Sequence, residues 1–248
     1  MNRDWIRLFF TGLWVEFQQK LWPAEKSQAE AVLIERMLRL TGPTRLLDAP
    51  CGDGRLTLEL ARRGHKTVGI DICPELLAGA RDKSDAEKLD ASFTLGDMAD
   101  INEERAYGAA ICVWGSLGYR AERDDLKFLR GVHKALAPGG GFVLEAATME
   151  SLFTNFQETG WRKAGEVFAL EKRVWRPETS RIECEWTLIK GGRVEIKYSS
   201  IRVYCYREIV AMLFDAGFEG VKSFNSAGEE SKSFNENSLY FKARRPGA

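Results

Sequence analysis

The residues best suited to bind a ligand form a short loop with two glycines, Asp48-x-x-x-Gly52-x-Gly54. The loop lies between a predicted buried strand at residues 45–49 and a predicted helix at residues 55–63. Glycine has no Cβ, so a ligand can approach its backbone closely, and the start of a helix offers free N–H groups. In a doubly wound sheet, ligands bind at the carboxyl ends of the strands. The loop therefore predicts a site for a nucleotide-like ligand.

Acidic residues follow the next two predicted strands. Asp71 ends a strand at residues 66–71, and Asp97 and Met98 follow a strand at residues 91–96. A carboxylate after the second strand is suited to a ribose diol. Asp97 is suited to accept a hydrogen bond from an adenine amino group, and Met98 to cover the adenine ring. Acidic residues after strands are common in turns, so the prediction depends on their combination with the glycine loop.

A dinucleotide would use similar geometry, but details of the loop argue against it. Thr57 stands where the third glycine of a Gly-x-Gly-x-x-Gly motif would be. Asp48 favours a cationic group over a pyrophosphate. An NAD(P) oxidoreductase would also need a Tyr-x-x-x-Lys or histidine base. Of the two histidines, we expect His65 to be exposed and His133 to lie away from the strand ends.

These motifs together resemble class I S-adenosylmethionine (SAM)-dependent methyltransferases of the small-molecule subgroup. The resemblance spans residues 44–145 and is carried by Leu46–Arg55, Val68–Glu75, Gly96–Met98 and Leu136–Gly140. It implies a seven-stranded sheet whose last strand is antiparallel, with SAM as the cofactor. By the same resemblance, the glycine loop holds the methionine part of SAM. Asp71, after the second strand, binds the ribose, and Asp97, after the third strand, binds the adenine. The implied cofactor residues are Asp48, Ala49, Gly52, Gly54, Asp71, Ile72, Asp97, Met98 and Trp114.

Two further segments indicate the methyl acceptor. Residues 114–119 and 200–204 resemble small-molecule N- and O-methyltransferases that act on glycine-like amino acids or amino sugars. The Asp/Asn-Pro-Pro-Tyr and Pro-Cys motifs of nucleic-acid base methyltransferases are absent from the sequence. We predict that the acceptor pocket includes Trp14, Ser116, Tyr119, Arg202 and Tyr204, with Trp14 and Trp22 in a lid. Tyr119 or Glu145 is the expected proton acceptor.

The order of predicted elements indicates an α/β fold in a single domain, residues 1–248. Residues 1–40 are expected to form a helical lid, with a first helix ending before Pro23 and a second starting after Ser27. Residues 41–148 form the SAM-binding core, a doubly wound and mainly parallel sheet. Residues 149–206 form an inserted antiparallel meander over the active site, with three strands at 166–175, 181–190 and 193–206. Residues 207–248 complete the seven-stranded sheet.

Composition limits the possible partners. Lys and Arg total 36, as do Asp and Glu, so the net charge is zero, whereas nucleic-acid binders usually carry a basic excess. The five cysteines are scattered and form no Cys-x-x-Cys pair, so we expect a reducing compartment and no metal site. No apolar stretch approaches membrane-spanning length. The sequence predicts a cytoplasmic monomer or homodimer that binds a small-molecule acceptor, with no nucleic-acid or membrane partner.

The predicted reaction is transfer of a methyl group to a nitrogen or oxygen atom by in-line displacement. Because the sulfonium leaving group is already activated, the protein mainly positions the nucleophile and excludes water. Two alternatives stay open at this point. The acceptor is a protein or an RNA, or the chain is a non-catalytic SAM-binding module that serves a partner. The aromatic N-terminal segment and the meander suit a pocket that closes over a small acceptor, but either would equally suit a dimer interface.

Overall fold

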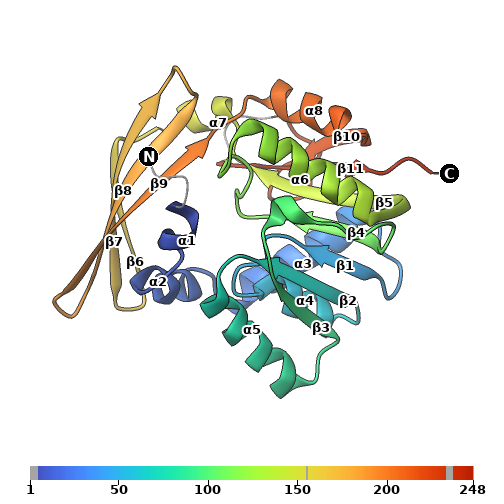
Figure 1. The fold of residues 1–248 in the computed structure, drawn as a ribbon, viewed down its shortest axis with the longest axis horizontal. Coiled ribbons are helices and arrows are strands. Elements are labelled where there is room, and N and C mark those ends of the chain that lie inside the picture. The colour runs from blue at the N-terminus through green and yellow to red at the C-terminus, as the bar shows by residue number, and fades with distance from the viewer. Residues whose placement is uncertain (1–4, 155, 233–236, 248) are drawn as a thin grey trace.

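The computed structural model describes residues 5–154, 156–232 and 237–247. Its main sheet has seven strands in the order β10-β11-β5-β4-β1-β2-β3 (Figure 1). Only β11 runs against its neighbours β5 and β10, as predicted for the last strand. The strands are β1 (Arg45–Asp48), β2 (Lys66–Asp71), β3 (Ala91–Leu95), β4 (Tyr107–Cys112), β5 (Leu136–Ala146), β10 (Glu219–Phe224) and β11 (Leu239–Arg244).

Helices cover both faces of the main sheet, and each face has its own apolar core. Leu46 and Ile111 face α3 and α4, whereas Leu47 and Ala110 face α6 and α8, because side chains alternate along a strand. The doubly wound fold predicted from the sequence is therefore confirmed. The helices are α3 (Ala24–Leu38), α4 (Arg55–Arg62), α5 (Pro74–Glu87), α6 (Glu122–Ala135), α7 (Met149–Thr154) and α8 (Tyr206–Asp215), with a 3-10 turn at Met98–Asp100.

The second sheet is antiparallel and has four strands, so the predicted count of three was wrong. The strands are β6 (Thr159–Ala164), β7 (Val167–Arg176), β8 (Arg181–Lys190) and β9 (Arg193–Arg202). The missed strand β6 is an edge strand that pairs only with β7. Its sequence Thr-Gly-Trp-Arg-Lys-Ala lacks the alternation that marks the other three. The third predicted strand also ends earlier, because backbone pairing with β8 stops at Arg202.

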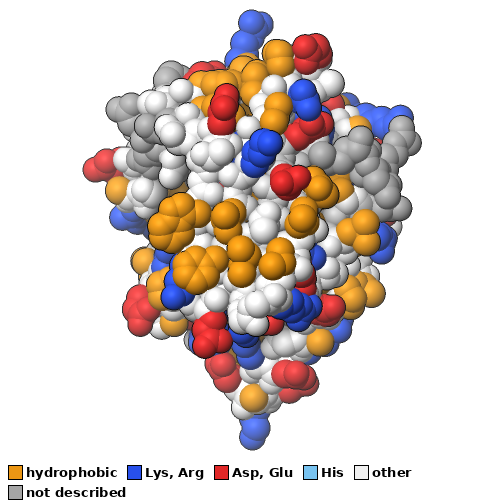
Figure 2. All heavy atoms as spheres, turned by 90° about the vertical axis from the view of Figure 1, so that its left-hand side faces the viewer, with side chains coloured by type: hydrophobic (Ala, Val, Ile, Leu, Met, Phe, Trp, Pro, Cys, Tyr) orange, Lys and Arg blue, Asp and Glu red, His pale blue; other side chains and the backbone are white. Residues whose placement is uncertain are grey.

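Two short helices, α1 (Trp5–Phe9) and α2 (Leu13–Leu21), lie between the two sheets (Figure 1). Their buried side chains pack against the inward face of the second sheet, where Ala169 and Leu188 are fully buried. The outward face of this sheet is open, and Figure 2 shows apolar side chains gathered on it. That face includes Trp161, Phe168, Leu170, Val194, Ile196 and Tyr198. The N-terminal helices are therefore held between two layers, although some of their residues, such as Leu8, stay exposed.

Two details of the predicted elements need correction. The helix after Pro23 starts at Ala24 and not after Ser27, because a proline suits the position just before a helix as well as its first turn. His65 is buried and not exposed, at 4% relative exposure. Its Nδ1 accepts a hydrogen bond from the Thr44 backbone N–H at 3.2 Å, and its Nε2 lies 2.9 Å from Glu35. This histidine therefore lies at the start of strands β1 and β2, at the opposite end of these strands from the glycine loop.

The loop after β4 is fastened to the second sheet at Gly118. The Gly118 carbonyl accepts hydrogen bonds from the Arg202 backbone N–H at 2.8 Å and from the Arg181 guanidinium at 3.2 Å. The same guanidinium also reaches the carbonyls of Tyr119, Arg120 and Ser200. Gly118 has a φ of +95°, and a Cβ there would lie 2.0 Å from the Arg202 carbonyl oxygen. Only glycine allows the loop to approach the β9 backbone this closely.

The fastening predicts a large difference between two glycine substitutions in the same loop. Gly118→Ala would force two backbones apart as well as strain φ, so we expect a loss of unfolding free energy of about 3 kcal/mol or more. Gly115 has a φ of +66° but open space around its Cβ position. Gly115→Ala should therefore cost only about 1–2 kcal/mol. Urea denaturation of both variants measures this, and equal losses would contradict the role given to Gly118.

Candidate functional site

A cavity opens at the carboxyl ends of β1, β2 and β4, below the N-terminal helices. It encloses about 830 Å³, including its open mouth. The structure brings nine of the predicted site residues together around it: Asp48, Gly52, Asp71, Ile72, Asp97, Met98, Trp114, Ser116 and Tyr119. Trp22, predicted to belong to a lid, also lines it, whereas sequence reasoning missed Phe10, Gln18, Arg55 and Arg120. The predicted ligand end of the sheet is thus a real cavity.

The glycine loop is shaped by the acid at the end of β2. One Asp71 oxygen accepts a hydrogen bond from the Gly52 backbone N–H at 2.7 Å, and the other accepts from the Cys73 N–H at 2.8 Å. Gly52 and Gly54 have φ values of +56° and +72°, where other residues are strained. A Cβ on Gly54 would lie 2.8 Å from the Phe93 ring. Gly54 therefore serves packing at the start of α4, and Gly52 lines the cavity itself.

Asp48 is a fully buried carboxyl group at the end of β1. Its Oδ2 accepts a hydrogen bond from the Thr57 hydroxyl at 2.6 Å. Its Oδ1 is buried and has no hydrogen-bond partner among the described residues. Burial is the main cause that raises the pKa of Asp48 to about 7, although the Thr57 hydrogen bond acts to lower it. A cationic ligand in the cavity would stabilise the ionised form. Ala49, next in the chain, faces the core and donates its N–H to Ile111.

The acid after β3 already has partners. Asp97 accepts a hydrogen bond from the Ala99 N–H at 3.0 Å, which caps the 3-10 turn. Its other oxygen forms an ion pair with Arg120, which comes from the loop after β4. Met98 is buried at the cavity wall beside them. The pair closes this end of the cavity. Nothing in the spacing of the sequence indicates that residues 97 and 120 meet.

Two tryptophans form another part of the cavity wall. The rings of Trp22 and Trp114 meet edge to face, with centroids 5.6 Å apart. The Arg55 guanidinium lies 5.3 Å from the Trp22 ring centroid and forms an ion pair with Glu30 at 2.6 Å. Trp114 has a φ of +72°, so the chain turns sharply as it leaves β4. A charged and aromatic part of the wall therefore adjoins the glycine loop, which Arg55 directly follows.

A second cavity adjoins the first and encloses about 620 Å³. We call it the aromatic chamber. Phe10, Trp114 and Tyr119 belong to the walls of both cavities, so these three residues lie where the two spaces adjoin. The remaining wall of the chamber consists of Trp5, Phe9, Trp14, Phe17, Leu21, Arg162, Trp186, Ser199 and Ile201. The chamber therefore lies between the N-terminal helices and the inward face of the second sheet.

The two residues predicted as proton acceptors differ in position. Tyr119 stands at the junction of the cavities, and its burial raises the pKa of its phenol well above the usual value. Glu145 lines neither cavity. It accepts hydrogen bonds from the Trp114 N–H and, at 2.6 Å, from the Ser238 hydroxyl. Burial raises the pKa of Glu145. Glu145 thus holds the chain after β4 from behind.

Arg202 and Tyr204 also lie outside both cavities. Arg202 forms an ion pair with Glu208 at 2.8 Å, and its guanidinium lies 4.6 Å from the Tyr204 ring centroid. The Tyr204 hydroxyl donates to the buried Asp125 carboxylate at 2.7 Å. These side chains therefore join β9 to α6 and α8. The sequence identified the right strand, but the residues of that strand that line the chamber are Ser199 and Ile201.

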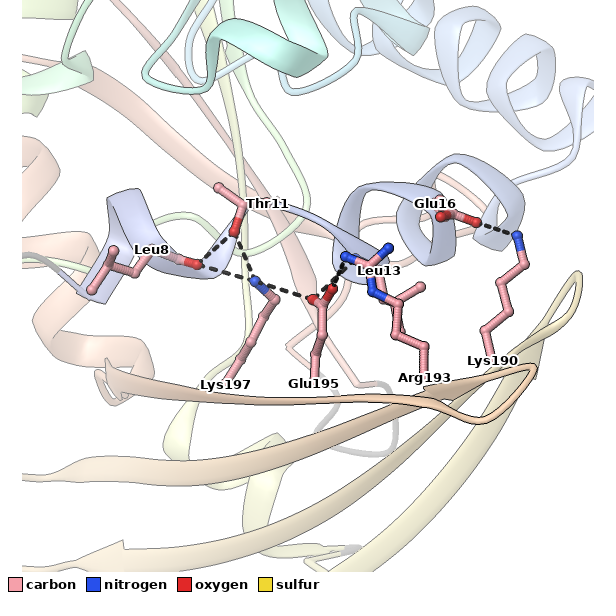
Figure 3. Close-up of polar contacts among 8 residues, drawn as sticks. All are labelled: Leu8, Thr11, Leu13, Glu16, Lys190, Arg193, Glu195 and Lys197. Carbon is pink, nitrogen blue, oxygen red and sulfur yellow. Dashed lines mark hydrogen bonds and ion pairs between the residues drawn. The ribbon is translucent and has the colours of Figure 1, made fainter.

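A polar contact holds the junction of α1 and α2 on β9, as Figure 3 shows. Lys197 donates to the Leu8 carbonyl at 3.1 Å and to the Thr11 hydroxyl at 2.8 Å. Glu195 accepts a hydrogen bond from the Leu13 N–H at the start of α2, at 3.1 Å. The Lys197 Nζ lies 3.7 Å from the Glu195 Oε2. Phe10, which both cavities share, is thereby held in place by its neighbours in the chain.

Comparison with known proteins shows which proteins the chain resembles. Residues 46–140 match the family described as a methyltransferase domain. Magnesium-protoporphyrin O-methyltransferase from Rhodobacter capsulatus is 39% identical over 101 residues, which are 40% of this chain and 45% of that protein. The dTDP-3-amino-3,4,6-trideoxy-alpha-D-glucopyranose N,N-dimethyltransferase from Streptomyces venezuelae is 25% identical over 210 residues, covering 81% and 82%. A solved SAM-dependent methyltransferase from Clostridium acetobutylicum ATCC 824 has a TM-score of 0.79 at 16% identity, covering 95% and 97%.

Residues 46–140 are thus similar to SAM-dependent methyltransferases, and the chain as a whole has the fold of the solved examples. The cavity is suited to SAM, because the buried Asp48 carboxyl group has an unpartnered oxygen, and a cationic ligand beside it would stabilise its ionised form. Among the described residues, the chain has no group of three or more His, Cys, Asp or Glu side chains that could hold a metal ion. Over the same residues, no helix is long and apolar enough to cross a membrane.

The raised pKa of Asp48 predicts how the stability of the protein depends on pH. The folded state keeps the Asp48 proton up to about pH 7, whereas the unfolded chain loses it near its ordinary value of 3.8. The folded state therefore binds more protons, and the unfolding free energy should fall as pH rises from 4 to 7, by at most about 4 kcal/mol from this group. Urea denaturation of Asp48→Asn across that range should give a shallower fall than wild type. The exposed Asp90→Asn variant serves as the control, and identical slopes for Asp48→Asn and wild type would contradict the assignment.

The contacts of Lys197 predict the local stability of the N-terminal helices. Its side chain is 10% exposed, and burial lowers its pKa, so the ammonium group depends on its hydrogen-bond and ion-pair partners to stay charged. Lys197→Met should loosen α1 and α2 by about 1–3 kcal/mol, because it removes hydrogen bonds from a charged donor. Hydrogen exchange of amides in residues 5–21 should then be about tenfold faster or more. Lys222→Met, which removes an exposed ion pair with Glu230, should leave exchange in this segment unchanged.

Proposed function

We propose that this protein transfers the methyl group of SAM to a nitrogen or oxygen atom of a small-molecule acceptor. The observation that carries the proposal is that two cavities lie next to each other and share Phe10, Trp114 and Tyr119 as wall residues. One cavity has the acidic strand ends and the glycine loop that suit the cofactor. The other is an aromatic chamber, and concave, mostly apolar walls of this kind are typical of small-molecule sites.

The residues around the first cavity support distinct roles toward SAM. The backbone of Gly52 and the Asp48 carboxyl group face the methionine part, with Arg55 suited to its carboxylate. Asp71 is the ribose ligand, and Ile72 packs beside it. Asp97 and Met98 lie where the adenine ring belongs, with Asp97 fixed in place by Arg120. Ala49 and Gly54 act indirectly, because they shape the loop and do not line the cavity.

The chemistry asks mainly for positioning. SAM supplies an activated methyl group, so the chain must align the acceptor atom with it and keep water out. Phe10, Trp114 and Tyr119 form the rim at which the two must meet. Tyr119 is suited to donate a hydrogen bond to the acceptor, because a phenol is protonated at neutral pH and burial raises the pKa of this one further. We therefore assign Tyr119 the role of orienting the acceptor. Glu145, Arg202 and Tyr204 support the surrounding loops.

The relatives favour a nitrogen acceptor. Two of them are named as N,N-dimethyltransferases of dTDP-linked amino sugars, and a solved neighbour is titled a sugar N-methyltransferase. Residues 5–21 close the chamber as a lid in this proposal, and the second sheet forms its opposite wall. A chamber closed on two sides favours a small molecule over the alternatives of an RNA or a protein segment. The aromatic rim is also more than a non-catalytic SAM-binding module needs.

We also propose that the protein is cytoplasmic and is a monomer or homodimer. The cysteines support the location. All five cysteines are free thiols, and four of them are buried. Free thiols are typical of a reducing compartment. Oligomeric state is measured directly by sedimentation of the purified protein.

Two measurements test the proposed function. Calorimetry should show that S-adenosylhomocysteine binds the wild-type protein and that Asp71→Asn weakens this binding about tenfold or more, because a charged hydrogen bond contributes about 1.5–3 kcal/mol. Asp90→Asn, which changes an exposed carboxylate, should bind as wild type does. Incubation with labelled SAM and a pooled metabolite extract should then put the label on a small molecule. Label found only on added protein or RNA would contradict the small-molecule acceptor.

A further inference from the structure

The chamber carries an unusual charged group on its inward sheet wall. Glu171 is buried at 4% relative exposure, in the middle of β7. Two guanidinium groups share it: Arg162 from β6, whose Nε lies 2.8 Å from one oxygen, and Arg173, which pairs with the other. Neither arginine has another carboxylate partner among the described residues. The trio therefore carries one net positive charge.

Arg162 presents that charge to the chamber. Its side chain is 48% exposed and lines the cavity. Only its Nε is used by Glu171, and its two terminal nitrogens form no hydrogen bond within the described part of the chain. Arg173 instead binds the Gln157 carbonyl and does not reach the cavity. The two terminal nitrogens of a guanidinium match the paired oxygens of a carboxylate, sulfonate or phosphate.

The rest of the chamber wall contains no carboxylate. The Ser199 hydroxyl accepts a hydrogen bond from the Trp186 indole at 3.1 Å, and the Trp14 indole donates to Gln18. The other residues that surround the space are aromatic or aliphatic side chains. Aromatic faces attract cations, but the unmatched positive charge at Arg162 opposes a cationic ligand in the same space. The wall therefore suits an apolar or aromatic body that ends in an anion.

We propose that the aromatic chamber takes an acceptor with an apolar or aromatic body and an anionic group, and that Arg162 binds this group. The inference rests on the proposed function, because it treats the chamber as the acceptor site. The anionic end would lie at the second sheet, and the atom to be methylated would lie toward Tyr119 and the cofactor cavity. Arg162 is in this view a residue that determines specificity and takes no part in the chemistry.

The test compares two dyes that share one aromatic body. The probes are 8-anilinonaphthalene-1-sulfonate, which is anionic, and N-phenyl-1-naphthylamine, which lacks the sulfonate. Fluorescence titration of the whole protein should give an affinity for the anionic dye that is about tenfold higher or more. Arg162→Gln should remove this preference, whereas Arg162→Lys should keep most of it. Arg176→Gln, which changes an exposed arginine paired with Glu183, is the matched control and should bind as wild type does.

Each other outcome overturns the inference. Equal affinity of the wild type for the two dyes, or tighter binding of the neutral dye, would show that the chamber does not select an anion. A preference that survives in Arg162→Gln would place the anionic dye elsewhere, for example on the apolar outward face of the second sheet. The titrations are run with and without S-adenosylhomocysteine. Failure to bind S-adenosylhomocysteine would contradict the proposed function. If S-adenosylhomocysteine binds but the two dyes bind the chamber with equal affinity, only this inference is contradicted.

Discussion

The arrangement of the whole molecule depends on a layer of aromatic side chains between its two sheets. Trp5, Phe9, Trp14 and Phe17 are all nearly inaccessible to solvent, and they pack on one another and on Trp186 of the second sheet. Burial of large aromatic side chains is among the strongest local contributions to stability. This layer keeps the sheets at a distance that a direct sheet-to-sheet contact would not allow. The two cavities are the space that the layer leaves on either side of Phe10 and Tyr119.

Apolar packing alone does not fix where the N-terminal helices lie along the second sheet. Polar contacts at the borders of the aromatic layer fix this position. Lys197 and Glu195 bind the chain where α1 ends and α2 begins, so that the two helices cannot slide along β9. Arg181 binds three successive carbonyls of the loop after β4. These carbonyls need a donor because they face the second sheet and not solvent. The rim residue Tyr119 is thus held from the core on one side and from the inserted sheet on the other.

The sequence was sufficient for the core because its signals there are local. The loop at residues 48–54 and Asp71 are defined by short motifs at strand ends, and the structure brings them together as expected. The residues that sequence reasoning missed depend on contacts between distant segments. Arg120 meets Asp97 only because the loop after β4 leads into α6, which packs against the 3-10 turn that follows Asp97. Edge strand β6 has no apolar alternation that would reveal it. No spacing rule indicates such contacts in advance.

The acceptor side shows the same limit more sharply. Residues 200–204 resemble known acceptor segments, yet register decides which side chains of β9 reach the chamber. Because side chains alternate along a strand, Ser199 and Ile201 face the chamber, and Arg202 faces Glu208 instead. A shift of one residue exchanges the two sets.

The same alternation puts Arg162 and Glu171 on the inward face, so the pairing of β6 with β7 sets the charge of the chamber. The cofactor end of the joined cavities is lined by the carboxyl groups of Asp48, Asp71 and Asp97, and the far end by Arg162. Under the proposed function, a cationic cofactor and an anionic acceptor would each meet the opposite charge. Their uncharged parts would face each other at the aromatic rim, where the methyl group passes.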